Sequence, residues 1–365
     1  MVRIYFVVQL GMEEIAVQEF QELCSCTAIS VHAGLIVGDI TPEQVLLVLQ
    51  RMQSPQRILL AIAEPTNTVE TIAFDDRLKL YFYPQCRIKV EVENVRGQEV
   101  RSRIARNVAG KLISAVENVC GFEPVVEMKK PTIIVYAVCV EGTYYVGVDA
   151  AGFELHARRY RLFPSAASFK GDFGYYFVRA SGFQRGEKLL VGFVKDGTLA
   201  IEAALLANGV PLYPQSTAFS YLSFPLFQGV QCALERLPSS TTVYAFDSSS
   251  PAVVAARRNV SLAGLKSLVD VKRCLLDELE VVYLSASFDR IIFYVSKKDE
   301  ELINEIYYQA STLLKEGGFL LLLRCGSSDT VEPASFTVIS NGVISRGDSV
   351  YSWRLFQKKV KPHLL

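Results

Sequence analysis

Two groups of basic residues are spaced so that they could bind a phosphate backbone. The first group lies on or near the polar side of a long helix expected over Glu99 to Val119, and at the start of a later strand. A single charge of this kind is more often a solvated surface residue, but a cluster on a small α/β unit favours contact with phosphates. The sequence therefore predicts a nucleic-acid surface that consists of Arg101, Arg103, Arg106, Lys111, Lys129 and Lys130.

The second basic group lies in a connecting segment, residues 156–180, with very few acidic residues. Its first part, HARRYRLFPSAASFK, carries four basic side chains and no acid. Lysine and arginine side chains bind the backbone of a nucleic acid and position it without reading its sequence. We therefore expect Arg158, Arg161 and Lys170 to extend the same contact.

Residues that bind metals or form disulfides are sparse. The chain has eight cysteines with no CxxC pair among them, and three histidines, His32, His156 and His363. Tetrahedral zinc sites usually show closely spaced ligand pairs, which are absent from this sequence. We therefore expect no metal site, and we expect most cysteines to be buried as small apolar side chains.

Composition places the chain among globular proteins. Of its 365 residues, 50% are hydrophobic and 21% are charged, which is sufficient for two or three domains. The 38 basic and 38 acidic residues balance, but local patches rather than the total decide nucleic-acid binding. No apolar run is long enough to span a bilayer, and the N-terminus is typical of a strand followed by a helix rather than a cleaved leader. These features favour a cytoplasmic protein without membrane contact.

The first half of the chain alternates strands and helices in two small units. Residues 1–65 predict the order β-α-β-β-α-β, which is typical of a ferredoxin-like unit. Thr41 and Gln44 can form a capping box around Pro42, so a helix should begin there. Residues 66–155 predict a strand, the long helix and a strand pair that turns at Glu141.

The second half, residues 181–365, predicts a doubly wound parallel sheet. Strand patterns such as KLLVGFV, TVYAFD, DRIIFYV and GGFLLLLR alternate with helical patterns at regular spacing. That alternation is typical of a parallel sheet with helices on both faces. The last two strand patterns, which end in SVYSWRLFQKK, predict an antiparallel pair.

Five segments, in this order along the chain, resemble motifs of the THUMP-domain RNA methyltransferases. They are GMEEIAVQEFQEL, TYYVGVDAAGFELHARRYR, DGTLAIEAAL, VYAFDSSSPAVVAARRNVSLAGL and KEGGFLLLL. The resemblance is strongest to the archaeal and bacterial enzymes that methylate the exocyclic amine of a guanine in tRNA. It implies a THUMP-like RNA-binding domain over residues 66–155, a basic linker over 156–180 and a Rossmann-like class I methyltransferase domain over 181–365. It also implies tRNA as the partner and S-adenosylmethionine as the cofactor.

The segments that correspond to the cofactor site match this family only in part. Gly197 and Thr198 match the end of the glycine-rich turn, and Asp247 matches the acid that holds the ribose hydroxyls. Val191 replaces the acid that ends the first strand, and Lys195 replaces a glycine that lets the cofactor approach the backbone. Asp247 could equally be a strand-end acid that caps the next helix.

The segment that corresponds to the catalytic loop departs further. In the resembled enzymes an Asn (or Asp)-Pro-Pro-Tyr loop orients the target amine, and its aromatic ring stacks on the flipped base. Here the strand that carries Asp289 continues into Tyr294, Val295, Ser296 and Lys297, which provide neither the carboxamide nor the two prolines. Tyr294 could stack on a base, but ordinary packing is favoured. His156 occurs in this family without a catalytic role, so we expect a structural one.

Three functions are compatible with this pattern. The leading hypothesis is a tRNA-binding protein whose methyltransferase domain has lost, or nearly lost, cofactor binding and catalysis, so that it acts as a scaffold or as the partner of a catalytic methyltransferase subunit. The alternative is an active methyltransferase in which Glu202 helps to frame the cofactor, and Asp289 or Tyr294 takes part in catalysis. A third possibility is a different, anionic ligand attracted by Lys195.

Overall fold

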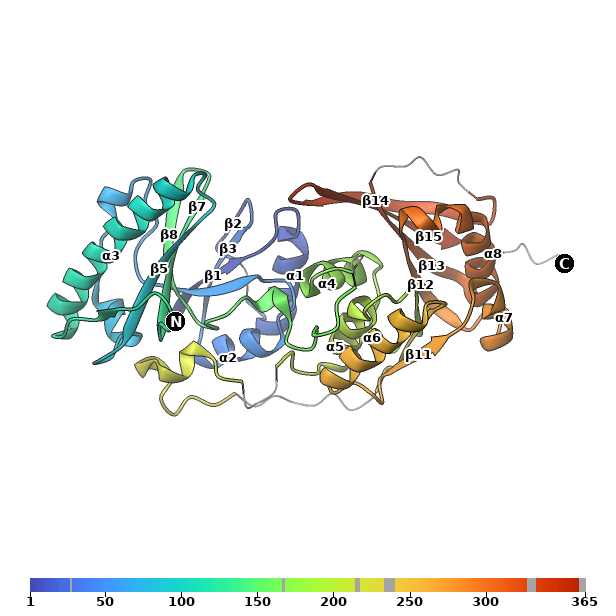
Figure 1. Cartoon of the computed structure of the whole chain (residues 1–365), viewed down its shortest axis with the longest axis horizontal. Coiled ribbons are helices and arrows are strands. Elements are labelled where there is room, and N and C mark those ends of the chain that lie inside the picture. Colours follow the sequence, from blue (N-terminus) through green and yellow to red (C-terminus); the bar gives the residue numbers. More distant parts are fainter. Residues whose placement is uncertain (27, 166–167, 214–216, 233–239, 327–332, 361–365) are drawn as a thin grey trace. The chain divides into compact units, whose positions relative to one another are not determined.

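The structure is a computed structural model of a mixed α/β protein with two sheets (Figure 1). It describes residues 1–26, 28–165, 168–213, 217–232, 240–326 and 333–360, without the side chains of Lys297 and Lys298. The chain divides into two compact units. Unit 1 comprises Met1–His156 with Tyr213–Leu234, and unit 2 comprises Ala157–Leu212 with Glu235–Leu365.

Unit 1 contains an eight-stranded sheet in the order β2-β3-β1-β4-β8-β7-β5-β6. Because β4 pairs antiparallel with β8, the hydrogen bonds of one sheet continue across the expected boundary at residue 65. The strands are β1 Val2–Val7, β2 Ser30–His32, β3 Leu35–Ile40, β4 Arg57–Ala61, β5 Arg87–Glu93, β6 Val125–Val126, β7 Ile133–Val140 and β8 Thr143–Asp149.

The helices of unit 1 begin and pack as the sequence predicts. They are α1 (Glu13–Cys24), α2 (Pro42–Arg51) and α3 (Gln98–Cys120), with 3-10 turns η1 (Val69–Thr71) and η2 (Asp76–Leu80). The capping box of Thr41 and Gln44 is present at the start of α2. The helix α3 runs beside β5 (Figure 1) and buries residues at helical spacing: Ile104, Val108, Leu112 and Val116.

A later segment of the chain also belongs to unit 1. The Tyr213 hydroxyl donates to the carbonyl of Leu155 (2.8 Å), and Tyr213 and Phe219 both pack against Phe153. The segment contains η4 (Ser220–Ser223) and η5 (Pro225–Phe227). This return of the chain is not predicted by the sequence, because no local pattern shows which unit an aromatic loop will cover.

Unit 2 contains a seven-stranded sheet in the order β11-β10-β9-β12-β13-β15-β14. The five strands from β11 to β13 are parallel, and β15 and β14 continue the sheet as the predicted antiparallel pair. The strands are β9 Leu189–Gly192, β10 Val243–Asp247, β11 Val269–Arg273, β12 Phe288–Val295, β13 Leu314–Cys325, β14 Phe336–Arg346 and β15 Ser349–Lys358.

The expected alternation of strands and helices in unit 2 is confirmed. Its helices are α4 (Gly171–Ala180), α5 (Thr198–Asn208), α6 (Ser250–Leu262), α7 (Leu279–Val282) and α8 (Ile303–Leu313). Short turns η6 (Leu276–Glu278) and η7 (Lys297–Leu302) precede the last two, and η3 (Leu155–Ala157) lies at the border of the units. Helix α4 falls within the expected linker and is largely buried, because its apolar residues pack beside α5.

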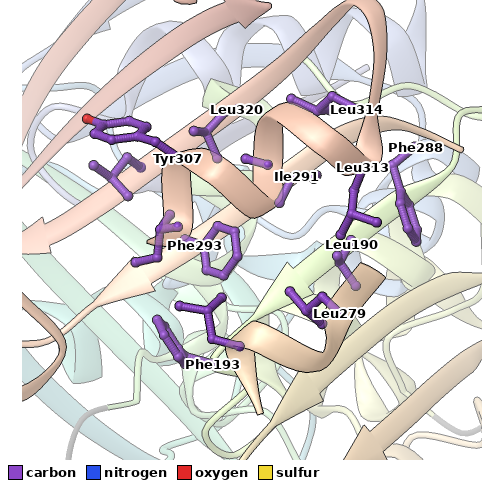
Figure 2. Close-up of a cluster of buried hydrophobic side chains, with 14 of the residues drawn as sticks. Leu190, Phe193, Leu279, Phe288, Ile291, Phe293, Tyr307, Leu313, Leu314 and Leu320 are labelled. Atoms are coloured by element: carbon purple, nitrogen blue, oxygen red, sulfur yellow. The ribbon is translucent and has the colours of Figure 1, made fainter. Parts of the chain in front are cut away.

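The core of unit 2 lies between the sheet and the helices α7 and α8. Figure 2 shows side chains from β9, β12 and β13 packed against Leu279 of α7 and Leu313 of α8. Phe193, in the loop after β9, belongs to the same cluster and packs against Phe293. This core therefore reaches the edge of the sheet at which the parallel strands end.

Two general findings concern membranes and metals. Among the helices of the described residues, none is long and apolar enough to cross a membrane. In the same part of the chain, no group of three or more His, Cys, Asp or Glu side chains is arranged to hold a metal ion.

A buried carboxyl at the end of β8 should make the stability of unit 1 depend on pH. Asp149 is fully buried, accepts the Ala151 amide (3.0 Å) and lies 3.8 Å from the Arg57 guanidinium. Burial raises the pKa of Asp149 to about 6, and Arg57 opposes this shift only in part. Because the folded pKa exceeds the unfolded one, the stabilisation from protonating Asp149 is complete below about pH 4 and is lost as the pH rises through 6.

We therefore expect the stability of unit 1 to vary less with pH in the variant Asp149→Asn than in the wild type. Between pH 4 and pH 8 the wild type should lose about 2 to 3 kcal/mol relative to the variant. Urea unfolding followed by circular dichroism measures this difference. The fluorescence of Trp353, the only tryptophan in the chain and part of β15, reports unit 2 separately. Parallel pH profiles for the two proteins would contradict the assignment.

Candidate functional site

The loops that follow β9, β10 and β12 meet at the carboxyl edge of the unit 2 sheet. The chain runs from β9 outward to β10 and β11, and then returns to β12 on the other side of β9. In open parallel sheets, ligands bind at this edge, where the strand order reverses. This is therefore the place in unit 2 where a ligand site is expected.

The loop after β9 has an unusual backbone. Phe193 and Lys195 both have left-handed φ angles, of 54° and 52°, which side chains other than glycine rarely adopt. Phe193 lies in the core, 6.0 Å from the ring of Phe246 and 5.6 Å from that of Phe293. The packed aromatic ring holds the loop in this strained conformation.

Asp247, at the end of β10, is nearly fully buried and is hydrogen bonded to the backbone. One carboxylate oxygen accepts the Lys195 amide (3.1 Å), and the other accepts the Ser249 amide (2.9 Å). Ser249 is in turn the N-cap of α6. This geometry agrees with the interpretation of Asp247 as a strand-end acid that organises the start of the next helix.

The Lys195 side chain connects this loop to the loop after β12. Its ammonium lies 3.4 Å from Asp299 Oδ2, and both side chains are about one fifth exposed. The same carboxylate accepts the hydroxyl and the amide of Ser296, at 2.6 and 3.1 Å, in a capping box at the start of η7. Lys195 therefore ties together the loops after all three strands, through its amide to Asp247 and its ammonium to Asp299.

The N-terminus of α5 is capped from within the chain. Gly197 has a φ of 87°, and a Cβ there would lie 3.2 Å from Ala256, so the position requires glycine. The Thr198 amide and hydroxyl both donate to Asp196 Oδ1, at 3.2 and 2.8 Å. The first turn of this helix therefore already has a carboxylate at its positive end.

Arg158 and Arg161 are not surface contacts, which corrects the expectation for the basic linker. The Arg158 side chain is fully buried in a two-bond ion pair with Glu202 (2.8 and 3.1 Å), and the Tyr160 hydroxyl donates to the same carboxylate (2.6 Å). Arg161 pairs with Asp196 (2.8 Å) and also donates to Ser168. The buried Arg158 guanidinium cannot reach an RNA phosphate, and the partly buried Arg161 guanidinium is already paired with Asp196, so both arginines stabilise unit 2.

The residues expected at the catalytic loop lie at opposite ends of β12. Asp289 lies at the amino end of β12, where it accepts the Lys315 ammonium (2.6 Å) and the Lys188 amide (2.8 Å). Burial alone would raise the pKa of Asp289, but these hydrogen bonds lower it below its usual value. Its participation in catalysis is therefore contradicted, because the amino end of β12 is at the opposite edge of the sheet from the candidate site.

Tyr294 and Val295, at the carboxyl end of β12, are buried. The ring of Tyr294 packs 4.5 Å from that of Phe169, and burial raises the pKa of its hydroxyl far above the usual range. Ordinary packing of Tyr294 is therefore confirmed. The Ser296 hydroxyl donates to Asp299, and the side chain of Lys297 lies outside the described part of the structure.

Two residues of the basic cluster of unit 1 line a groove beside α3. Arg101 and Arg106 line a pocket of about 370 Å³ beside α3, β5 and the edge strand β6. Met128 and Val126 provide an exposed apolar wall. The residues of this groove are Val90, Glu91, Val92, Gln98, Arg101, Ser102, Ala105, Arg106, Ala109, Val126 and Met128.

The other predicted RNA contacts differ in their surroundings. Arg103, Lys129 and Lys130 are exposed on unit 1. The Lys111 ammonium instead donates to the carbonyls of Glu70 and Ile72 and so fixes the turn η1. Lys170 is the N-cap residue of α4 and is partly buried. His156 is buried beside Glu154, at 3.1 Å, which is consistent with a structural role.

Sequence reasoning missed Asp299 and Phe193, which shape the candidate site, and assigned Glu202 to the cofactor rather than to an ion pair. Asp299 could have been found from its spacing to Ser296, which is typical of a capping box. Glu202 is the one charged residue in the otherwise apolar helix TLAIEAALLAN, which is a sign of a buried ion pair. Phe193 gave no signal, because a phenylalanine after a strand is usually ordinary core.

Comparisons with known proteins place unit 2 among the methyltransferase folds. Residues 158–317 match a family model described as RMKL-like, methyltransferase domain. The ribosomal RNA large subunit methyltransferase K/L of Chromohalobacter salexigens is 27% identical over 186 residues, which are 46% of this chain and 25% of that protein. The tRNA (guanine(6)-N2)-methyltransferase of Archaeoglobus fulgidus is 23% identical over 277 residues, 74% of this chain and 69% of that protein.

Solved structures extend the likeness of fold to almost the whole chain. The crystal structure of SMU.472 complexed with SAH has a TM-score of 0.73 and covers 99% of each chain, at 15% sequence identity. At this identity the likeness shows the fold alone. The chain spans only about a quarter of the length of the first two K/L relatives that match it.

S-adenosylmethionine, which these similarities imply, does not fit the residues at the carboxyl edge as they are arranged. Val191 is fully buried and offers no acid, and the Lys195 side chain spans the approach to Asp299. Both oxygens of Asp247 already accept backbone amides. The acid that would face a charged amino acid is therefore absent, and the acid that would face a ribose is already hydrogen bonded to two backbone amides.

Proposed function

We propose that this chain is an RNA-binding protein with the fold of the RNA methyltransferases, and that its own side chains fill the usual cofactor site. The observation that carries the proposal is the Lys195 bridge, which joins Asp247 and Asp299 across three loops. To open it, a ligand must break an ion pair and a backbone hydrogen bond to a buried carboxylate, each worth on the order of 1 to 3 kcal/mol.

The domain organisation that we propose follows the resemblance. Residues 1–65 are a ferredoxin-like domain and residues 66–155 a THUMP-like RNA-binding domain. Residues 156–180 connect them to a Rossmann-like methyltransferase domain over 181–365, whose site is degenerate. The strand order β4-β1-β3-β2 supports the first assignment, because it is the order of a split β-α-β unit.

RNA would be bound through the groove of unit 1. Arg101 and Arg106 can pair with phosphates, while the apolar wall of Val126 and Met128 can pack against a base or a ribose. Arg103, Lys129 and Lys130 add exposed positive charge on the same unit. We propose tRNA as the RNA, because the Archaeoglobus fulgidus relative, of which 69% is covered, is named a tRNA methyltransferase. A cytoplasmic location and a catalytic methyltransferase subunit as partner complete the proposal.

The alternative is an active methyltransferase, which is favoured by the match of residues 158–317 to a methyltransferase domain. In that case a bound RNA would have to rearrange the Lys195 bridge before the cofactor could enter. The two functions differ in one measurable outcome, which is methyl transfer by the protein alone.

We expect the purified protein to bind tRNA but to transfer no label from radioactive S-adenosylmethionine to unmodified tRNA. A heat-inactivated sample gives the background, and an active tRNA methyltransferase gives the positive control. Radioactive label on tRNA above background would establish the active enzyme instead, provided that a variant with Arg101 and Arg106 both changed to glutamate no longer transfers it. Absence of tRNA binding would refute the RNA-binding proposal itself.

A further inference from the structure

Unit 2 exposes a group of large apolar side chains along α7 and α8. Val281 and Leu284 are 86% and 82% exposed, and Leu275 and Tyr308 are about half exposed. We call these four residues the α7–α8 patch. Exposed apolar groups that lie together on one surface usually mark an interaction site.

The elements that carry the patch are packed side by side. Both η6 and α7 contact α8, which lies next to them in Figure 1. The Tyr308 hydroxyl of α8 donates to Glu280 of α7 (3.4 Å), and the Ala286 amide donates to the carbonyl of Thr312 (2.9 Å). Residues 280–286 therefore lie beside the second half of α8, on which Tyr308 is exposed.

The segments that carry the patch are acidic, although Lys272 of β11 lies over the ring of Tyr283 beside them. The segments 275–288 and 299–312 contain seven acidic residues and no lysine or arginine. Most of these carboxylates are exposed, whereas Asp299 is held by Lys195. The acidic residues are Asp277, Glu278, Glu280, Asp299, Glu300, Glu301 and Glu305.

From this surface we infer that the α7–α8 patch binds a protein partner through a basic, amphipathic helix. The acidic rim repels phosphates, so RNA is not the occupant, and it equally disfavours a second copy of the same acidic surface. A helix with leucine-like residues on one side and lysine or arginine on the other would cover the apolar groups and neutralise the rim. This inference does not depend on whether the chain methylates RNA.

The probe is a synthetic 18-residue peptide that places leucines on one helical face and lysines on the other. A scrambled peptide of the same composition has the same charge without the apolar face. Fluorescence anisotropy with the full chain should show binding of the helical peptide, at least about tenfold tighter than of the scrambled one. Raising the salt from about 0.05 to about 0.5 M should weaken binding at least about tenfold.

The double variant Val281→Lys and Leu284→Lys should weaken peptide binding by at least about tenfold, because it removes the apolar anchors and adds repulsion. The matched control is Val343→Lys together with Ile339→Lys, which changes two exposed apolar residues of β14 in the same unit. The control should bind the peptide like the wild type, and both variants should keep the tRNA affinity of the wild type.

Several results would overturn the inference. Equal binding of the helical and scrambled peptides, or equal loss in the control variant, would mean that charge alone causes the association. If no binding is detected at millimolar peptide, the patch is not a binding site for such a helix. A loss of tRNA affinity in the Val281 and Leu284 variant would make RNA the occupant, and a dimer that this variant dissociates in sedimentation would make a second copy the occupant.

Discussion

Replacing Arg158 by alanine should lower the free energy of unfolding of unit 2 by about 3 to 5 kcal/mol. The guanidinium forms two bonds to Glu202 in a site from which solvent is excluded, and Tyr160 donates to the same carboxylate. The substitution leaves a buried carboxylate without its charged partner. It also leaves a cavity beside Gly171, where a side chain larger than glycine would collide with Arg158 in the native protein.

Urea unfolding followed by the fluorescence of Trp353 measures this loss, because the only tryptophan of the chain lies in unit 2. The matched control is Arg159→Ala, which changes the exposed neighbouring arginine and should cost less than about 1 kcal/mol. When Arg158→Ala and Glu202→Gln are combined, the loss in free energy of unfolding should be smaller than the sum of the two single losses. The reason is that the second change removes the buried charge that the first one leaves unpaired. A loss below about 1 kcal/mol in Arg158→Ala would mean that the pair is not the buried bridge described above.

The second large effect should be on RNA. Reversal of Arg101 and Arg106 to glutamate should lower the affinity for tRNA by about 100-fold or more at low salt, because two phosphate contacts become repulsive. The slope of log affinity against log salt should become shallower by about 1.5, since fewer counterions are released. Filter binding or anisotropy over a range of salt concentrations measures both quantities.

A matched control for charge is Lys79→Glu with Arg77→Glu, which reverses two basic residues of unit 1 outside the groove. That variant has the same net charge as the groove variant and should retain most of the tRNA affinity. Equal losses in the two variants would show that overall charge, rather than the groove, determines binding.

The sequence predicts much of the fold because its patterns are local. The capping box at Thr41 and the apolar spacing of Ile104, Val108 and Leu112 act within a few residues, and both appear as expected. The alternation of strands and helices after residue 187 likewise gives the parallel sheet and its antiparallel end. The return of residues 213–232 to unit 1 depends on contacts between aromatic rings far apart in the sequence, which no local pattern contains.

The site is harder to predict because the same residue type can serve at the surface or in the core. Arg158 belongs to a basic run that indicates a solvated face, yet Glu202, 44 residues later, draws it into unit 2. Asp289 belongs to the expected catalytic strand, but only the direction of β12 shows that it lies at the wrong edge. Lys195 was expected to block a cofactor, and its partner Asp299 becomes visible only when the loops are placed together.

The most direct test of the central claim is isothermal calorimetry of S-adenosylhomocysteine and S-adenosylmethionine with the purified protein. The Lys195 bridge and the occupied Asp247 predict no heat of binding up to millimolar ligand, while tRNA binding is intact. Micromolar binding to the wild type would contradict the account, because it would show that the three loops open for the cofactor despite the bridge.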